Sequence, residues 1–455
     1  MDAPGIMAAE ALTQITPLQA LTRRIRWRIY AFLFIFGCIA YFQQKGLTVA
    51  AHRMMPELGL TQMQIGWLEW AFVLGYASFQ FPGGVIGQRL GARVMFTVIS
   101  TTAFLATVLT PLAPFALHGT VLLVALFLLQ LIMGLSQGAI FPVSSGVMEA
   151  WFRPERWAFV QGLQSAGLQL AAAATPLVVA HLMSALGWQQ ALIWPALPAV
   201  FVIVLWAWYG RNTPAEHRSV TPEELAELGE GNVPTEQAPI SWRRLRSLMT
   251  ERSIMLLTLS YICMNYVFYL IANWCFLYLV QERHFNVFDS GLFAALPPLA
   301  AALGAGLGGK LVAVTCRRLG DRWGFRIVPM IALPASGSML LLTVHLNNPY
   351  CAVIALAMAY LTVELTEGPF WGATMFVARS DTMSATGILN TGGNAGGLIG
   401  IPIVAYLSGH GQWTAAFVIG AVASLLSAAA WFGIDAERPF VPPDGSGARS
   451  APALN

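Results

Sequence analysis

Apolar residues in this chain gather into about twelve runs, each long enough to cross a lipid bilayer as a helix. A spanning helix needs roughly 20 mostly apolar residues. Charged residues make up only 10% of the chain, whereas a soluble domain carries about 25%. The sequence therefore predicts an all-α membrane protein. The expected spans are 28–51, 62–87, 92–114, 119–148, 156–184, 188–210, 253–281, 287–314, 326–346, 350–378, 383–408 and 413–434.

The two halves of the chain share a pattern of helix-breaking and small residues. Gly83-Gly84 opens GGVIGQRLG, and Gly308-Gly309 opens GGKLVAVTCRRLG about half the chain length further on. Two further pairs repeat at nearly the same offset, Pro176 with Pro402 and Trp188 with Trp413. Paired apolar halves with matching breakers are typical of secondary transporters built from repeats, whose binding site lies where the halves meet.

One long polar stretch divides the spans into six and six. We expect residues 1–27 to form a cytoplasmic tail, 28–210 an N-terminal six-helix bundle and 211–252 a partly helical cytoplasmic linker. Residues 253–434 then form a C-terminal six-helix bundle, and 435–455 a second cytoplasmic tail. With this topology the inner loops hold nineteen arginines and the outer loops only Arg53 and Arg283. Because cytoplasmic loops are enriched in Lys and Arg, both termini are expected inside.

Other features exclude several classes of protein. The five cysteines are scattered in apolar segments without metal-type spacing, and we expect them to be small buried hydrophobes. The first twenty residues have no basic segment followed by an apolar run, so we expect no cleaved signal peptide and expect the first span to stay as a helix. No basic cluster interleaved with aromatics suggests nucleic acid. No nucleophile–base set suggests an enzyme, and we expect no cofactor or metal.

Several segments, in order and spacing, carry a family resemblance over nearly the whole chain. These segments are PELGLTQMQIGWLEWAFVLGYASFQFPGG (56–84), WYGRNTPAEH (208–217), SYICMNYVFYLIANW (260–274), GPFW (368–371) and GILNTGGNAGG (387–397). The chain resembles the major facilitator superfamily, and within it the anion:cation symporter family of hexuronate, galactonate and phthalate permeases and sialin-like carriers. The resemblance implies the major facilitator fold and alternating access of two six-helix halves.

The inner-loop motif of that superfamily is a glycine, a carboxylate and then arginines. The matching residues here are Gly84, Gln88, Arg89, Gly91 and Arg93. In the superfamily the charges of this loop clamp the two halves together on the inner side. Because glutamine replaces the acid, we expect the outward-open clamp to be looser, and Gln88→Asp tests this.

The first span departs from the family pattern in its charges. The resembling permeases place an Asp for protons and an Arg for the substrate carboxylate two and three residues after a tyrosine. Here Tyr41 is followed by Gln43 and Gln44. Lys45 comes next, about 100° further round the helix. It either binds a substrate anion, or pairs with a membrane carboxylate or extends to the membrane surface.

Three acids lie inside expected spans, where charge is costly and usually functional. Glu69 lies in the second span, before Tyr76, which resembles a substrate-contacting tyrosine of the family. It is either a proton-coupling residue or a structural partner of Lys45. Glu364 and Glu367 are three residues apart and share one helical face. Two such close carboxylates rarely both ionise, so the pair is a candidate proton carrier, with a hydrogen-bond network between helices as the alternative.

Uncharged polar residues complete the expected binding site. Gln137 stands where the resembling permeases often have a protonatable Glu, so proton coupling is expected to have moved, first of all to Glu367. Amides and phenols bind hydroxyls and carboxylates by hydrogen bonds, and an aromatic ring suits a sugar or aryl face. The further candidates for substrate binding are Tyr41, Gln44, Gln164, Tyr266, Trp371, Asn390 and Asn394, the last two of which also fit close helix packing.

The sequence thus predicts a monomeric, proton-coupled transporter of a small organic anion in a bacterial inner membrane, with the lipid bilayer as its solvent. A facilitator or exporter of a neutral, zwitterionic or cationic compound stays open, because the usual arginine and proton-carrying acids are replaced. A non-transporting sensor is disfavoured by the short C-terminal tail. The membrane charges are not repeated between the halves, since Lys45, Glu364 and Glu367 map onto Leu270, Ala139 and Pro142.

Overall fold

The computed structural model describes residues 17–222, 225–226, 241–283, 293 and 295–443, and all regular elements in these ranges are helices. The middle of the expected linker, and the start of the span expected at 287–314, lie outside the described residues. The first half contains α2 (Pro17–Leu58), α3 (Gln62–Leu90), α4 (Ala92–Leu112), α5 (Gly119–Gly138), α6 (Ile140–Trp151), α7 (Pro154–Leu186) and α8 (Trp188–Tyr209). The second half contains α11 (Arg252–Gln281), α13 (Leu296–His345), α14 (Pro349–Glu364), α15 (Glu367–Ala378), α16 (Thr382–Gly409) and α17 (Trp413–Ala430).

The described helices account for twelve membrane spans. Nine stretches of the described residues are long and apolar enough to cross a membrane. One of these is α13, whose 50 residues divide at Gly320, where φ is +76°. Another runs from Pro349 to Gly409 and joins α14 and α15 to α16. The 29-residue α3 lies outside the nine and completes the count. The predicted fold class is confirmed.

Local chemistry explains where individual helices begin and end. Thr61 and Gln64 form a capping box at the start of α3, which satisfies amide groups that a helix leaves unpaired. Gly91, at φ +81°, separates α3 from α4. Asn348 accepts from the amides of Tyr350 and Cys351 and so starts α14. The expected tail at 1–27 is already helical from Pro17, because α2 extends beyond the apolar run.

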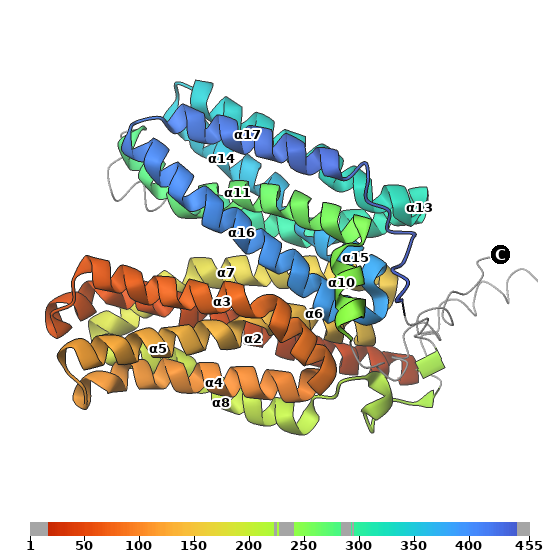
Figure 1. Cartoon of the computed structure of the whole chain (residues 1–455), viewed down its shortest axis with the longest axis horizontal. Helices are drawn as coiled ribbons and strands as arrows, with labels where there is room; N and C mark the ends of the chain where they lie inside the picture. The colour runs from red at the N-terminus through yellow and green to blue at the C-terminus, as the bar shows by residue number, and fades with distance from the viewer. Residues whose placement is uncertain (1–16, 223–224, 227–240, 284–292, 294, 444–455) are drawn as a thin grey trace, which may run out of the picture.

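Figure 1 shows the two halves as two layers of helices, with α3, α6 and α7 of the first half facing α16 and α15 of the second. The layers meet closely at the end that holds α6, α15 and the short helix α10 (Trp242–Met249), and they diverge toward the other end (Figure 1). The two layers of helices therefore diverge from this closed end.

The repeated glycine pairs make equivalent contacts in the two halves. A Cβ on Gly84 would lie 2.2 Å from the carbonyl oxygen of Met383, and one on Gly309 would lie 2.3 Å from that of Ala158. Met383 and Ala158 are separated in the sequence by the same offset as the two glycines. Each glycine thus lets its helix touch the opposite half, at positions where any side chain would push the halves apart.

Two spans are broken in the middle, again at equivalent positions. The fourth span breaks at Ala139, between α5 and α6, and the tenth breaks at Leu365-Thr366, between α14 and α15. Ala139 and Leu365 are separated by the same offset as the repeated prolines Pro176 and Pro402. Discontinuous helices in transporters mark binding sites, and the second break lies between Glu364 and Glu367.

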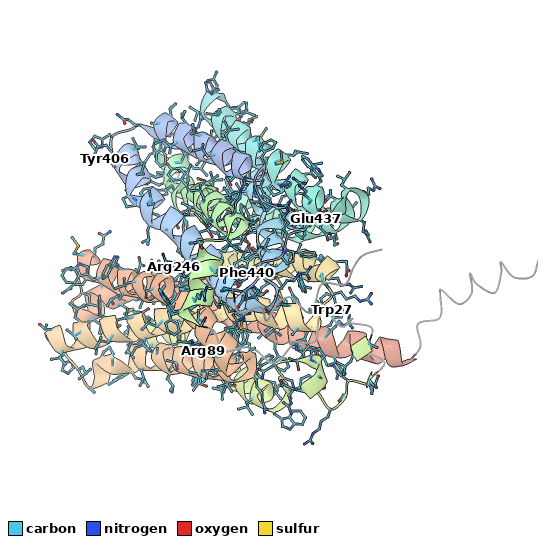
Figure 2. All side chains as sticks on the ribbon, turned by 45° about the vertical axis from the view of Figure 1, so that its right-hand side comes forward. Trp27, Arg89, Arg246, Tyr406, Glu437 and Phe440 are labelled. Carbon is cyan, nitrogen blue, oxygen red and sulfur yellow. The ribbon has the colours of Figure 1, made fainter. Side chains whose placement is uncertain are left out.

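The closed end is held by polar contacts among α3, α10 and the start of α16. Gln88 donates to the carbonyl oxygen of Ser380 at 2.6 Å and to the Asp381 carboxylate at 3.2 Å, and accepts from Ser384 at 2.7 Å. Arg244 of α10 pairs with the same Asp381 at 3.0 Å, and both side chains are buried. In Figure 2, Arg246 marks α10 at this end and Tyr406 lies toward the far end of α16.

Candidate functional site

A cavity lies between the two halves, at the level of the broken tenth span. The empty space in it, including space continuous with solvent, is about 670 Å³. The first half contributes Tyr41, Tyr76, Phe141, Gln161, Gln164, Ser165, Leu168 and Gln169. The second half contributes Tyr261, Asn265, Phe268, Tyr269, Glu364, Glu367, Trp371, Asn390 and Asn394. A solute bound here touches both halves.

The two carboxylates of the cavity are held by different helices. Glu367 accepts from the Tyr261 hydroxyl at 3.0 and 3.2 Å and from the Trp371 indole nitrogen at 2.8 Å. Glu364 accepts from the Ser165 hydroxyl at 3.2 Å and from the Gln169 amide at 3.0 Å. Glu364 is fully buried and Glu367 is 7% exposed. No described residue that lines the cavity is Lys, Arg or His.

Aromatic rings and amides form the rest of the cavity wall. Tyr269 donates to the side-chain oxygen of Asn394 at 3.1 Å. The Asn394 amide nitrogen donates in turn to the backbone oxygen of Asn390 at 2.8 Å. The rings of Phe141 and Trp371 approach across the halves, with centroids 6.2 Å apart. These groups offer hydrogen bonds and flat apolar faces, which suit a hydroxylated or unsaturated small molecule.

Most of the site residues expected from the sequence meet in this cavity. Those lining it are Tyr41, Tyr76, Gln164, Trp371, Asn390, Asn394, Glu364 and Glu367. Others lie elsewhere. Gln137 donates to Gln43 at 3.0 Å inside the first half, and Tyr266 points toward α17, where it donates to the Ala416 carbonyl at 3.4 Å. Gln44 does not line the cavity.

The charged pair of the first half also lies outside the cavity. Glu69 is exposed on the surface of α3, and Lys45 is half-buried on α2. Neither residue lines the space between the halves.

Several residues that line the cavity were not predicted from the sequence. On α7 these are Gln161, Ser165, Leu168 and Gln169, and on α11 they are Tyr261, Phe268 and Tyr269. The α7 set, and the α11 set together with Asn265, follow the spacing of three and four residues that defines one face of a helix. A polar face on an apolar span was the available signal, since glutamines and tyrosines there are costly unless they are used.

Some residues of the inner-loop motif contact the second half, and others contact the first half. Gly84 and Gln88 touch the second half, as described above. Arg93 instead donates to the Ala207 carbonyl at 3.0 Å, and its backbone amide donates to the Asn212 side chain at 2.8 Å. Both partners lie in the first half or directly after it. Arg89 is exposed at the end of α3 (Figure 2).

The fold and the cavity together define an integral, multi-pass membrane transport protein whose two helical halves enclose a solute site. The chain belongs to the Major Facilitator Superfamily, whose family model matches residues 33–380. This confirms the predicted resemblance and, with it, a transport protein rather than an enzyme.

Two of the relatives are named as transporters of organic anions. The "Probable sulfoacetate transporter" of Cupriavidus necator is 29% identical over 419 residues, which cover 89% of this chain and 95% of that protein. The "Probable L-galactonate transporter" of Escherichia coli is 27% identical over 368 residues, covering 80% of this chain and 78% of its own. Among solved structures, a proton:xylose symporter matches with a TM-score of 0.73 at 11% identity, covering 91% and 96% of the two chains.

Proposed function

We propose that this protein is a secondary active transporter that takes up a small organic anion together with protons. The observation that carries the proposal is the cavity between the halves, which holds two buried carboxylates and many neutral hydrogen-bond donors. The names of the relatives support an anionic substrate, such as a sugar acid or a sulfonated acid. Alternating access then follows from rocking of the halves about the site.

Proton binding explains how a cavity with acids and no described basic lining residue accepts an anion. Two ionised carboxylates repel an anion at close range in a poor dielectric. When both Glu364 and Glu367 carry protons, the cavity is neutral, and its phenol, amide and indole groups donate to the substrate oxygens. Release of the protons restores the repulsion and expels the anion. Substrate and protons are thus bound and released together.

The same proposal includes the membrane in which the protein lies and the orientation of the protein in that membrane. The bacterial relatives support the inner membrane of a bacterium. The arginine-rich segments lie at the closed end of the bundle, with Arg89 at the end of α3 and Arg244 in α10, which supports a cytoplasmic closed end and cytoplasmic termini. We propose that the protein works as a monomer, because the cavity is formed within one chain.

Uptake into proteoliposomes tests the proposal. Purified protein is first screened for thermal stabilisation by sulfoacetate, galactonate, galactarate, a hexuronate and a set of amines. The stabilising acid should then accumulate when the outside is acidic, and Glu367→Gln should abolish accumulation while exchange of labelled for unlabelled substrate continues. Glu69→Gln, on the outer surface of α3, is the matched control. Accumulation of the acid that does not depend on the pH gradient would contradict proton coupling.

One observation favours a second candidate, a carrier of a neutral or cationic solute. A carboxylate pair without a described basic lining residue is also a suitable site for an amine. In that case amines alone stabilise the protein in the thermal screen, and the organic-anion proposal fails.

A further inference from the structure

We propose that Glu364 is the positioning residue that links proton binding to the conformation of the protein, whereas Glu367 carries a proton without controlling the halves. The inference rests on the proposed proton coupling for its place in the transport cycle. It follows from which helices hold each carboxylate, and neither the repeat nor the family resemblance distinguishes the two acids.

All the described hydrogen-bond partners of Glu367 belong to the second half. Tyr261 lies on α11, and Trp371 lies four residues further along α15. When the halves rock as units, these bonds move with the carboxylate. Gain or loss of a proton at Glu367 therefore changes the charge of the cavity and leaves the contact between the halves unchanged.

Both described donors to Glu364 belong to the first half. Ser165 and Gln169 are four residues apart on α7, so they lie on one face and each holds one oxygen of the carboxyl group. Gln169 also lies 3.5 Å from the Tyr360 hydroxyl of α14. At the level of the cavity, Glu364 thus ties the end of α14 to α7 across the boundary between the halves.

No positive charge among the described residues faces Glu364 to stabilise its ionised form. The titratable groups that face it are Glu367 of α15, Tyr41 of α2, Tyr261 of α11 and Tyr360 of α14. The phenols stay neutral below about pH 9, Glu367 is an acid, and α7 contributes only the neutral Ser165 and Gln169.

Burial away from any described positive charge favours the protonated form of Glu364, although Ser165 and Gln169 can hydrogen-bond to either form. A neutral carboxyl group can donate to Ser165 and accept from Gln169, so both contacts persist. An anion that is buried without a cation is costly, and separation of α7 from α14 relieves the cost by admitting water. Proton binding at Glu364 therefore stabilises the conformation seen in the structure, with the ends of α7 and α16 apart, and proton release favours the alternative.

A distance measurement between spin labels tests this without any substrate. The labels are placed at Ala185→Cys on α7 and Tyr406→Cys on α16, two exposed positions at the diverging end, in full-length protein whose native cysteines are replaced. Between pH 5 and 9 the ratio of long to short distances should fall with rising pH, by up to about tenfold per pH unit for one linked proton. Glu364→Gln should keep the long distance at every pH, and Glu367→Gln should retain the response.

The outcomes separate this inference from the proposed function. A pH-independent distance in the wild-type protein overturns it, as does a response abolished by Glu367→Gln and kept by Glu364→Gln. The variant Ser165→Ala/Gln169→Leu removes both donors and should reduce the long-distance population at pH 5. If the distances respond as expected while no organic acid accumulates in proteoliposomes, the proposed function fails and the role of Glu364 stands.

Discussion

At the scale of single residues, this protein uses neutral side chains where charges were expected from the family pattern. Gln43 and Gln137 hydrogen-bond to each other inside the first half. Gln88 forms the contact at the closed end, while the acid of that contact, Asp381, comes from the opposite half. In this clamp the amide donor therefore lies in the first half and the acid lies in the second. The acid also pairs with Arg244.

We predict that Gln88→Asp weakens the closed end, the opposite of what the sequence pattern alone suggests. The new carboxylate loses the amide that donates to Ser380 and Asp381, and it places a second negative charge beside Asp381. A buried acceptor left unpaired costs about 1–3 kcal/mol. The thermal stability of purified Gln88→Asp should fall below that of Gln88→Asn, whose side chain has the same length as aspartate without the charge. Equal or higher stability of Gln88→Asp would favour the sequence-based expectation.

At the scale of elements, close contact between helices of different halves depends on glycine and on a short linker helix. The approach of α3 to α16 and of α13 to α7 leaves no space for a side chain at Gly84 or Gly309. α10 touches both halves, because Leu245 packs against Val85 of α3 while Arg244 pairs with Asp381. Backbone contacts at Gly84 and Gly309, and the linker helix α10 at the closed end, thus join the two halves.

Gly84→Ala should force α3 away from α16. The new Cβ would lie 2.2 Å from the Met383 carbonyl oxygen, so the helices must separate, and such overpacking costs about 1–3 kcal/mol. Gly66→Ala is the matched control on the same helix, because nothing lies within 4 Å of its Cβ. That substitution should be neutral or slightly stabilising through helix propensity. Thermal unfolding of both variants measures the difference, and equal effects would contradict the close contact.

Arg244→Ala should destabilise the closed end more than any other single change in α10. It leaves Asp381 buried, at 1% exposure, without its cationic partner, and breaking a buried pair in this way typically costs about 3–5 kcal/mol. Arg246→Ala, an exposed position two residues along the same helix, should have little effect. The spin-label pair on α7 and α16 provides the readout, since loosening of the closed end should shift the distances toward the shorter population.

At the scale of the whole molecule, the internal repeat provides a symmetric frame around an asymmetric site. The glycine contacts and the broken spans recur at matching positions of the two halves. The two acids of the cavity occur in one half only, at the break between α14 and α15. Symmetry permits two related conformations, and under the proposed proton coupling, protonation of the unrepeated acids favours one of them.

The proposed orientation predicts which cysteine reacts from outside the cell. Cys351 is exposed near the start of α14, at the end of the bundle away from α10. A membrane-impermeant thiol reagent added to intact cells should therefore label it, and Cys351→Ser should remove the labelling. Labelling of Cys351 only in inverted membrane vesicles would reverse the orientation. Transport by Cys351→Ser should be unchanged, since the residue does not line the cavity.

The sequence by itself determined the class, the number of spans and the two related halves, because each of these depends on apolar run length and on the order of helix breakers. It also identified about half of the residues that line the cavity, including Glu364, Glu367 and Trp371, because polar groups in an apolar span stand out. Only the tertiary structure decided that Tyr266 and Lys45 lie outside the cavity, and that Ser165 and Gln169 hold Glu364. The physical reason is that spacing along a helix defines its faces, while the packing of the helices decides what each face contacts.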